Sequence, residues 1–434
     1  MKLRVNLLVA ALLSAVVCTA DPSQRLVGGD ISLIPAYEAA NTPYYDRNGN
    51  KINDLVTYLA TECHWNACRI RLFVNPVIIN ADGTHQGEVQ DLAYVTALAK
   101  RAKDAGMAFL LDFHYSDTWA DPSRQTIPAA WQTINGEGRL VTEDQLADTL
   151  YGYTTECLRA LAAAGAAPDY VQIGNEITCG ILWRSQSEKV NAAQSYSANQ
   201  TNWHRFAKYL KSGAKAVRDV CPDAKVMLHI ERIQLTAACL AFFNNLAKDT
   251  VDYDVIGLSY YPFWHGWLDK ELCGTLNAFE ANFPDKPIHI VETAYYNNYF
   301  PSSKYNTAEV WPATEAGQDA FLADMITEVR QHPNVQAIYY WFPEENGNGG
   351  ASYNANNLVI TSWLNRGLFN PQTHRALKGL YRLSDYLSDE TALDDIRVPF
   401  RSDVIWSVTG QPLGTDLSAL QAGVYIRNGQ VILK

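Results

Sequence analysis

The chain has 434 residues, of which 47% are hydrophobic and 19% charged, and its formal net charge is −11 at pH 7. This composition is globular, excludes an intrinsically disordered chain and allows a full core. The negative charge argues against nucleic acid and anionic membrane surfaces as partners and favours a neutral substrate. Eleven Trp and 24 Tyr suit a sugar-binding cleft, although most aromatic residues in any chain belong to its core.

The first 20 residues have the pattern of a signal peptide. Lys2 and Arg4 precede an apolar run over 7–17, and small residues near Ala20 offer a cleavage site. The run is too short to span a bilayer permanently. Cys18 is an alternative site for a lipid anchor. We therefore expect an exported protein, either secreted or a cell-surface lipoprotein of a bacterium, with no membrane span.

Seven cysteines remain after cleavage at Ala20. Their number is odd and no two form a CxxC pair, which argues against a zinc site. Cys63 and Cys68 are candidates for a disulfide in an oxidising compartment, whereas the apolar surroundings of most of the seven favour buried free thiols. The seven are Cys63, Cys68, Cys157, Cys179, Cys221, Cys239 and Cys273.

The chain after the signal opens with strands and a helix. A short strand is expected at 26–31. A second strand, over 66–74, places Arg69 and Arg71 on one face and apolar residues on the other. A helix over 92–105 then leads to a strand over 108–113.

The same helix–strand unit repeats along the chain. Eight strands mostly separated by helices predict a parallel sheet, and eight such units predict an α/β fold of the closed (β/α)8 TIM barrel type. An open doubly wound sheet is the alternative, but no GxGxxG follows the first strand to support it. The later segments are expected to be helix 143–164 and strand 170–173, helix 203–220 and strand 225–230, strand 254–258, strand 287–291, and helix 318–329 with strand 335–340.

The pattern changes near residue 387, where long helical periods stop. Two short β-like runs, 425–427 and 431–433, flank Asn428-Gly429, which is a strong signal for a hairpin. We therefore divide the chain into a signal peptide at 1–20, a barrel at 21–386 and a small C-terminal β appendage at 387–434. The appendage resembles the short tails of exported bacterial proteins, and we expect it to take no part in chemistry.

Polar residues follow the expected strands at their carboxyl ends, which converge on one face of a barrel. Singly, each is more often structural than functional. Together, two Glu with Arg, His and Tyr would form a buried cluster that is costly without a function. The residues are Arg69, Arg71, His114, Asp117, Asn175, Glu176, His229, Tyr261, Glu292 and Trp341.

Glu176 and Glu292 follow the fourth and seventh strands, an arrangement that suits hydrolysis of a glycosidic bond. One carboxylic acid protonates the leaving oxygen while the other, as a carboxylate, attacks the anomeric carbon. Asn175 is expected to bind the 2-hydroxyl of the sugar, and Arg71 with Tyr261 to keep Glu292 ionised. Three aromatic residues are expected to stack on sugar rings: Trp119, Trp264 and Trp341.

Seven sequence blocks, in order between residue 28 and about residue 377, resemble glycoside hydrolase family 53, the endo-β-1,4-galactanases. The longest are HYSDTWADP and GLSYYPFWHG; the others include GGDIS, CRIRLFVNP, QIGNEI, VETAYY and WLNRGLF. The resemblance implies a retaining barrel enzyme in which Glu176 is the proton donor and acid/base and Glu292 the nucleophile. It further implies a polysaccharide substrate, the β-1,4-galactan of pectin side chains. We expect the protein to act as a monomer.

Two features separate this chain from other members of the wider group of retaining barrel glycosidases. Many of them have His two residues before the Tyr of the sixth strand, whereas this chain, like the galactanases it resembles, has Ser259 there. Some relatives hold calcium in the loop after the seventh strand, but between Tyr295 and Trp311 this chain has only Glu309 as a carboxylate. We therefore expect no metal and no other cofactor. A related endo-glycanase acting on xylan, mannan or glucan stays an alternative, as does a glycan-binding barrel without catalysis.

Overall fold

The structure is a computed structural model that describes residues 25–39, 41, 43–76, 88–133, 140–193, 195–298, 304–347, 365–388, 405–407, 413–427 and 430–434. The expected signal peptide, with Cys18, lies outside these residues. Among the helices in the described part of the chain, none combines the length and apolar character needed to cross a bilayer.

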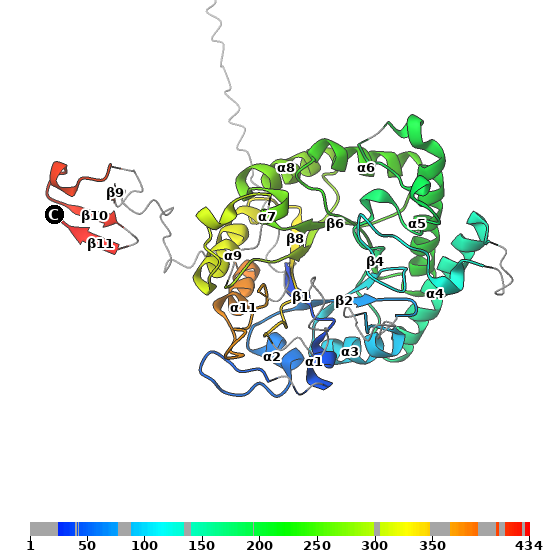
Figure 1. Cartoon of the computed structure of the whole chain (residues 1–434), viewed down its shortest axis with the longest axis horizontal. Helices are drawn as coiled ribbons and strands as arrows, with labels where there is room; N and C mark the ends of the chain where they lie inside the picture. Colours follow the sequence, from blue (N-terminus) through cyan, green and yellow to red (C-terminus); the bar gives the residue numbers. More distant parts are fainter. Residues whose placement is uncertain are drawn as a thin grey trace, which may run out of the picture.

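Eight parallel strands close into a barrel in sequence order, with β1 paired to both β2 and β8. This confirms the expected (β/α)8 fold, and Figure 1 shows the helices arranged around the strands. The strands are β1 Leu26–Asp30, β2 Ala67–Leu72, β3 Ala108–Phe113, β4 Tyr170–Ile173, β5 Lys225–Ile230, β6 Val255–Tyr260, β7 Ile288–Thr293 and β8 Val335–Trp341.

Several of the helices begin where the sequence supplies a side-chain cap for their free backbone N–H groups. At α4, the Thr142 side chain accepts from the backbone of Gln145, whose side chain accepts in return from the Thr142 backbone. Thr314 caps α9 and Asp91 caps α3 in the simpler one-sided way. The α-helices are α1 Ile34–Ala39, α2 Leu55–Thr61, α3 Leu92–Asp104, α4 Glu143–Ala163, α5 Gln200–Val220, α6 Thr236–Lys248, α7 Pro262–His265, α8 Cys273–Asn282, α9 Glu315–Val329 and α11 Lys378–Arg382.

The inside of the barrel has an apolar layer and, nearer the carboxyl ends of the strands, a polar one. The apolar layer consists of Ala67, Leu110, Met227, Val255, Val291, Ala337 and Tyr339. Because side chains alternate along a strand, the residues two positions further on also point inward. On β2, β3 and β5 these residues are Arg69, Asp112 and His229, all fully buried. The strand pattern therefore places charged groups inside the barrel, at the end where barrel enzymes have their active sites.

Close approach of β1 to β2 depends on Gly28. Gly28 pairs with Ala67, and a Cβ atom on Gly28 would lie 1.9 Å from the Ala67 carbonyl oxygen. Any larger residue would push the two strands apart. Asp30, at the end of β1, would then move away from its partners on β2.

A separate three-stranded antiparallel sheet follows the barrel, drawn in red in Figure 1. It consists of β9 Ile405–Ser407, β10 Val424–Arg427 and β11 Gln430–Leu433, and Arg427 pairs with Gln430 across the expected hairpin. The small β appendage is thus confirmed, while the two residues between β10 and β11 lie outside the described part.

The seven cysteines from Cys63 to Cys273 are all free thiols, and six of them are buried. Burial is the largest cause that raises the pKa of every one of these thiols. Cys63 and Cys68 therefore form no disulfide here, and the expectation of buried free thiols describes the structure.

Candidate active site

Glu176 stands on a strained turn directly after β4. Its backbone has φ 47° and ψ 54°, in the left-handed region that a Glu residue rarely adopts. Gly174, at φ 83°, makes the preceding bend, where a Cβ atom would lie 2.6 Å from Ile177 Cγ2. Strain of this kind persists only where the surroundings enforce it, and it is found at functional sites.

Glu292 lies within β7, at a place where the strand pairing is irregular. The register between β6 and β7 shifts between Leu258 and Ser259, so that Ser259 pairs with Glu292. Such irregularities in pairing re-aim side chains beside active sites. The shift brings Ser259, which contacts Glu176, beside the strand that carries Glu292.

One carboxylate oxygen of Glu176, one of Glu292 and a ring nitrogen of His229 lie within 4.8 Å of one another. Carboxyl groups about 5–5.5 Å apart are typical of retaining glycosidases, and those of inverting enzymes are about 6.5–9.5 Å apart. The short separation fits retention. The same three side chains could converge on a metal ion, but the Arg69 guanidinium lies 3.0 Å from Glu292 Oε1, and its positive charge opposes a cation there.

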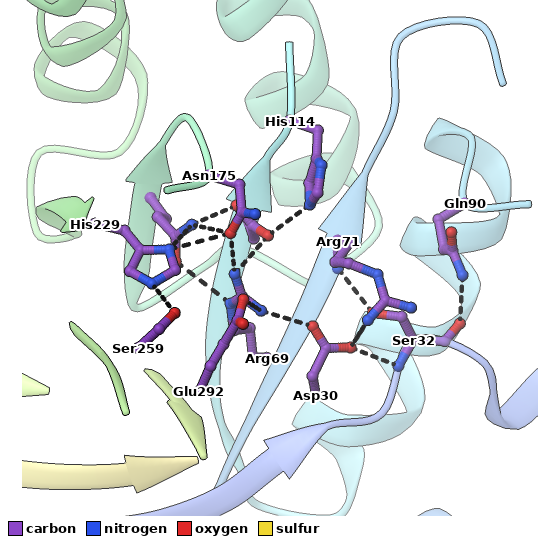
Figure 2. A network of polar contacts seen from close by, with 12 residues as sticks. Asp30, Ser32, Arg69, Arg71, Gln90, His114, Asn175, His229, Ser259 and Glu292 are labelled. Carbon is purple, nitrogen blue, oxygen red and sulfur yellow. Dashed lines mark hydrogen bonds and ion pairs between the residues drawn. The ribbon is translucent and has the colours of Figure 1, made fainter. Parts of the chain in front are cut away.

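Arg69 is the centre of the buried polar layer. Its side chain is fully buried and contacts three carboxylates: Asp30 at 2.9 Å, Asp112 at 2.8 Å and Glu292 at 3.0 Å. Its Nη2 also donates to Asn175 Oδ1 at 2.8 Å. Figure 2 shows Arg69 beside Asn175 and Glu292, with Asp30 between it and Arg71. One guanidinium thus fixes residues from four different strands or strand ends.

The expectation that Arg71 contacts Glu292 is wrong in detail, because Arg69 takes that position. Arg71 donates through Nη1 to Asp30 at 2.7 Å, and its guanidinium lies 4.7 Å from the ring of Trp119 and 5.7 Å from that of Trp341. Both Arg side chains point into the barrel, but Arg71 is two residues nearer the end of the strand. Arg71 therefore supports the aromatic residues rather than the carboxylate.

Tyr261 contacts Glu292 as expected, with its hydroxyl donating to Oε2 at 2.9 Å. Burial raises the pKa of Glu292 above its ordinary value, while Arg69 and the Tyr261 hydrogen bond act in the opposite direction. Arg69 lies at one carboxylate oxygen of Glu292 and the Tyr261 hydroxyl donates to the other. Glu292 is therefore the one of the two glutamates that loses its proton at the lower pH.

Glu176 has a different environment, which favours its protonated form. Burial, followed by the charges of Glu292 and Glu231, raises the pKa of Glu176 well above its ordinary value, and the hydrogen bond from Ser259 acts against this. Ser259 Oγ donates to Glu176 Oε1 at 2.8 Å and lies 2.9 Å from His229 Nε2. Burial and the Arg69 charge lower the pKa of His229 well below its ordinary value, so this imidazole is neutral.

Asn175 and His229 contact each other and hold the turn that carries Glu176. His229 Nδ1 lies 3.1 Å from Asn175 Oδ1 and accepts from the backbone N–H of Glu176 at 3.3 Å. Asn175 Nδ2 donates to the carbonyl of Ala120 at 2.8 Å. These contacts fix the tight turn that carries Glu176.

His114 and Asp117, both after β3, have different positions. His114 lies inside the polar layer, with Nε2 at 3.1 Å from Asp112 Oδ2. Asp117 accepts instead from the backbone N–H groups of Asn75 at 3.0 Å and Ala129 at 2.8 Å. Asp117 thus ties two loops together and does not join the carboxylate cluster.

The three expected stacking residues form two separate groups. Trp119 and Trp341 lie together, with ring centroids 6.2 Å apart. Trp264, on α7, packs against Tyr261 and Phe263 with centroids at 5.2 and 4.9 Å, and 38% of its surface is exposed. Trp264 is the most exposed of the three, because Trp119 is half-buried and Trp341 exposes only 7% of its surface.

Sequence reasoning assigned no role in the site to four residues that complete it. Asp30 and Asp112 balance the charge of Arg69, Gln172 donates to Asp112 at 2.6 Å, and Ser259 connects His229 to Glu176. A signal was present for Asp112, which is a lone acid within the apolar strand sequence AFLLDF. A charged residue in a buried strand requires a buried partner, and Arg69 on the neighbouring strand is the natural candidate.

A closed barrel with a half-buried and a buried carboxyl group at the ends of its fourth and seventh strands, with one oxygen of each within 4.8 Å of the other, defines a glycoside hydrolase of the retaining barrel class. The chain also matches glycosyl hydrolase family 53 over residues 26–383. It belongs to that family.

Relatives of the chain agree with this assignment. It is 33% identical over 356 residues to an arabinogalactan endo-β-1,4-galactanase of Cellvibrio japonicus, covering 79% of this chain and 87% of that protein. It is 30% identical over 326 residues to an endo-β-1,4-galactanase of Bacillus subtilis, covering 73% and 69%. Among solved structures, the family 53 catalytic domain of Ignisphaera aggregans is 30% identical, with a TM-score of 0.71 and coverage of 84% of this chain and 96% of that one.

Proposed function

We propose that the protein is an endo-β-1,4-galactanase that cleaves the galactan or type I arabinogalactan side chains of pectin with retention of configuration. The observation that carries the proposal is the pair Glu176 and Glu292, which are close enough for a covalent mechanism and differ in their charged neighbours, since only Glu292 has an adjacent cation in Arg69. Family membership and the activities printed for the relatives supply the substrate class.

In the first step, Glu292 attacks the anomeric carbon as a carboxylate. Glu176 transfers its proton to the glycosidic oxygen, and the leaving chain departs as the new C–O bond to Glu292 forms. In the second step, Glu176, now a carboxylate, removes a proton from water, which displaces Glu292 from the sugar. Two inversions give net retention. Glu176 supplies the proton of the first step and accepts the proton of the second, so we propose that no metal or other cofactor takes part.

The surrounding residues would bind and orient the sugar. Asn175 donates one of its amide N–H bonds to Ala120, and the second would donate to the 2-hydroxyl, a bond that strengthens in the transition state. Trp119 and Trp341 would flank the sugar beside Glu292, with Arg71 behind them. Trp264 would offer a stacking face on the other side of Tyr261. Arg69, His114 and His229 act through the carboxylates and Asn175, and Asp117 through the loops.

We further propose that the chain is exported by the signal peptide at residues 1–20, either released or held by a lipid on Cys18, and that it acts as a monomer on polysaccharide. Pectin side chains are too large to enter a cell intact, so an enzyme that cuts them must meet them outside. Mass spectrometry of the mature protein tests both forms. An N-terminus at residue 21 indicates release, and a diacylglyceryl group on Cys18 indicates an anchor.

The test of the activity is a product profile on linear β-1,4-galactan beside xylan, mannan and cellulose. The axial 4-hydroxyl of galactose bends the chain, and a cleft shaped for that bend should reject straight chains by sterics. We expect reducing-end release from galactan only, with the first product in the β configuration by proton NMR. Equal activity on a straight chain would support the alternative endo-glycanase, and binding without cleavage would support a glycan-binding barrel. A first product in the α configuration would contradict the covalent mechanism.

A further inference from the structure

The segment after β8 carries a buried cation, Arg366, close to the part of the site that holds Glu292. The Arg366 side chain is fully buried, and its guanidinium carbon lies above four aromatic rings. The distances to the ring centroids are 5.0 Å for Phe263, 5.1 Å for Trp264, 5.3 Å for Tyr296 and 5.9 Å for Tyr261. A guanidinium over the faces of several aromatic rings is attracted by all of them, most strongly where water is absent.

The backbone holds this cation at a fixed place. The Arg366 carbonyl accepts from the Tyr340 hydroxyl at 2.6 Å, and the neighbouring Asn365 carbonyl accepts from the Asn297 N–H at 2.8 Å. Segments after β6, β7 and β8 are thereby joined around one guanidinium. The rings that it contacts are therefore fixed relative to the barrel.

One of the four rings belongs to the direct hydrogen-bond partner of Glu292. Tyr261 donates to Glu292 Oε2 at 2.9 Å. Burial and the Glu292 charge raise the pKa of the Tyr261 phenol, and Arg366 acts against both. A positive charge near a phenol makes it a stronger hydrogen-bond donor, because it stabilises the electron density left on the oxygen.

We propose that Arg366 is a positioning residue for catalysis, which strengthens the Tyr261–Glu292 hydrogen bond and holds the Trp264 ring as a sugar-stacking face. Two cations then stabilise the carboxylate of Glu292: Arg69 by direct contact, and Arg366 through the hydrogen bond from Tyr261. This inference rests on the proposed function, since it assigns the second cation to the same nucleophile.

Other charged and titratable groups also act on Glu292, and the test must separate Arg366 from them. On the barrel strands and their ends these groups are Arg69, Asp30, Asp112, Glu176, His229 and Tyr261. None of them changes when Arg366 alone is replaced. A shift in the ionisation of Glu292 in such a variant therefore reports on Arg366 and on the ring that transmits its charge.

The experiment compares Arg366→Met, which removes the charge, with Arg366→Lys, which keeps it. The matched control is Arg25→Met, because Arg25 is also buried and lies 5.2 Å from the ring of Tyr386, but at the amino-terminal end of β1. We expect Arg366→Met to move the acidic limb of kcat/KM on galactan to higher pH by about 0.5 unit or more and to raise KM. Arg366→Lys should keep the acidic limb, and Arg25→Met should change neither quantity.

A double variant tests whether Tyr261 transmits the effect. In a Tyr261→Phe background, Arg366→Met should no longer move the acidic limb, because the phenol that it acts on is gone. An unmoved limb in Arg366→Met itself, or an equal shift with and without Tyr261, would overturn the proposal. Should Arg366→Met fail to fold, Arg366→Gln replaces it in the same comparison with Arg366→Lys.

A measurement that needs no substrate keeps this proposal separate from the galactanase assignment. Carboxyl-carbon NMR of protein labelled at glutamate, with Glu292 assigned by a Glu292→Gln variant, follows ionisation of Glu292 directly. We expect the titration midpoint of Glu292 to rise in Arg366→Met and to remain unchanged in Arg25→Met. A rise without galactan cleavage by the wild-type protein would refute only the galactanase assignment, and cleavage without a rise would refute only the role of Arg366.

Discussion

Replacing Arg69 by Met should remove much of the stability that the polar layer contributes, in a way that depends on pH. Three carboxylates, Asp30, Asp112 and Glu292, lie within 3.0 Å of this guanidinium. Breaking a buried ion pair by removing one partner costs about 3–5 kcal/mol, because a charge is left buried without compensation. We expect a loss of this size in the free energy of unfolding at pH 7.

Asp112 supplies the part of this loss that can be worked out. Burial raises the pKa of Asp112, but the charges of Arg69 and His114 more than compensate and lower it from 3.8 to about 2. A carboxyl group with a lowered folded pKa contributes stability that is present above its unfolded pKa and lost as the pH falls through the folded value. A shift of nearly two units corresponds to about 2 kcal/mol. The deficit of the Arg69→Met variant should therefore shrink between about pH 4 and pH 2.

Urea unfolding of wild type and variant at pH 7, 4 and 2.5 measures this deficit. Arg101→Met is the matched control, because Arg101 also contacts two carboxylates, Glu38 and Asp54, but is a third exposed; it should cost about 0–1 kcal/mol. The reasoning fails if Arg69→Met costs no more than Arg101→Met at pH 7. It also fails if the cost of Arg69→Met does not change with pH.

Four further results are expected from the site. With azide and an activated aryl galactoside, Glu176→Ala should give a β-galactosyl azide and Glu292→Ala the α anomer by NMR; the opposite pair would exchange their roles. Ser259→Ala removes the hydrogen bond that lowers the pKa of Glu176, so the basic limb of kcat/KM should move to higher pH, and a shift to lower pH would contradict this. Trp341→Ala should lower kcat as well as binding, and a change in KM alone would place this ring away from the cleaved sugar. A chain ending at Leu387 should keep its kcat on galactan within a few fold, whereas a loss of orders of magnitude in a folded protein would mean that the tail reaches the site.

Sequence periodicity was sufficient to predict the barrel. Each strand is a short apolar run, four of the eight follow a helix that the sequence also predicted, and the expected and observed strand bounds differ by a few residues at most. The strand ends then indicated which side of the barrel carries polar groups, as at Glu176 and Glu292. These inferences use only local patterns and one general rule about barrels.

The choice between Arg69 and Arg71 could not be made in the same way. Both point to the same side of β2 and differ by about 6–7 Å along the strand, so their partners depend on how far each neighbouring strand is staggered. Asp117 presents the same difficulty, because the backbone N–H groups that it binds belong to loops distant in sequence. Arg366 gives no local sequence signal either, since its partners are ring faces on two other segments, after β6 and after β7.

The free thiols of the barrel have a consequence for where this protein can fold. With no disulfide among the seven cysteines from Cys63 to Cys273, the native state of the barrel holds no covalent bond that a reductant could break. Burial also keeps most of these sulfurs protonated and out of reach of oxidants. The barrel can therefore form with the same stability in a glutathione-rich cytoplasm and in an oxidising exterior, and recombinant production needs no disulfide isomerase and no oxidative refolding.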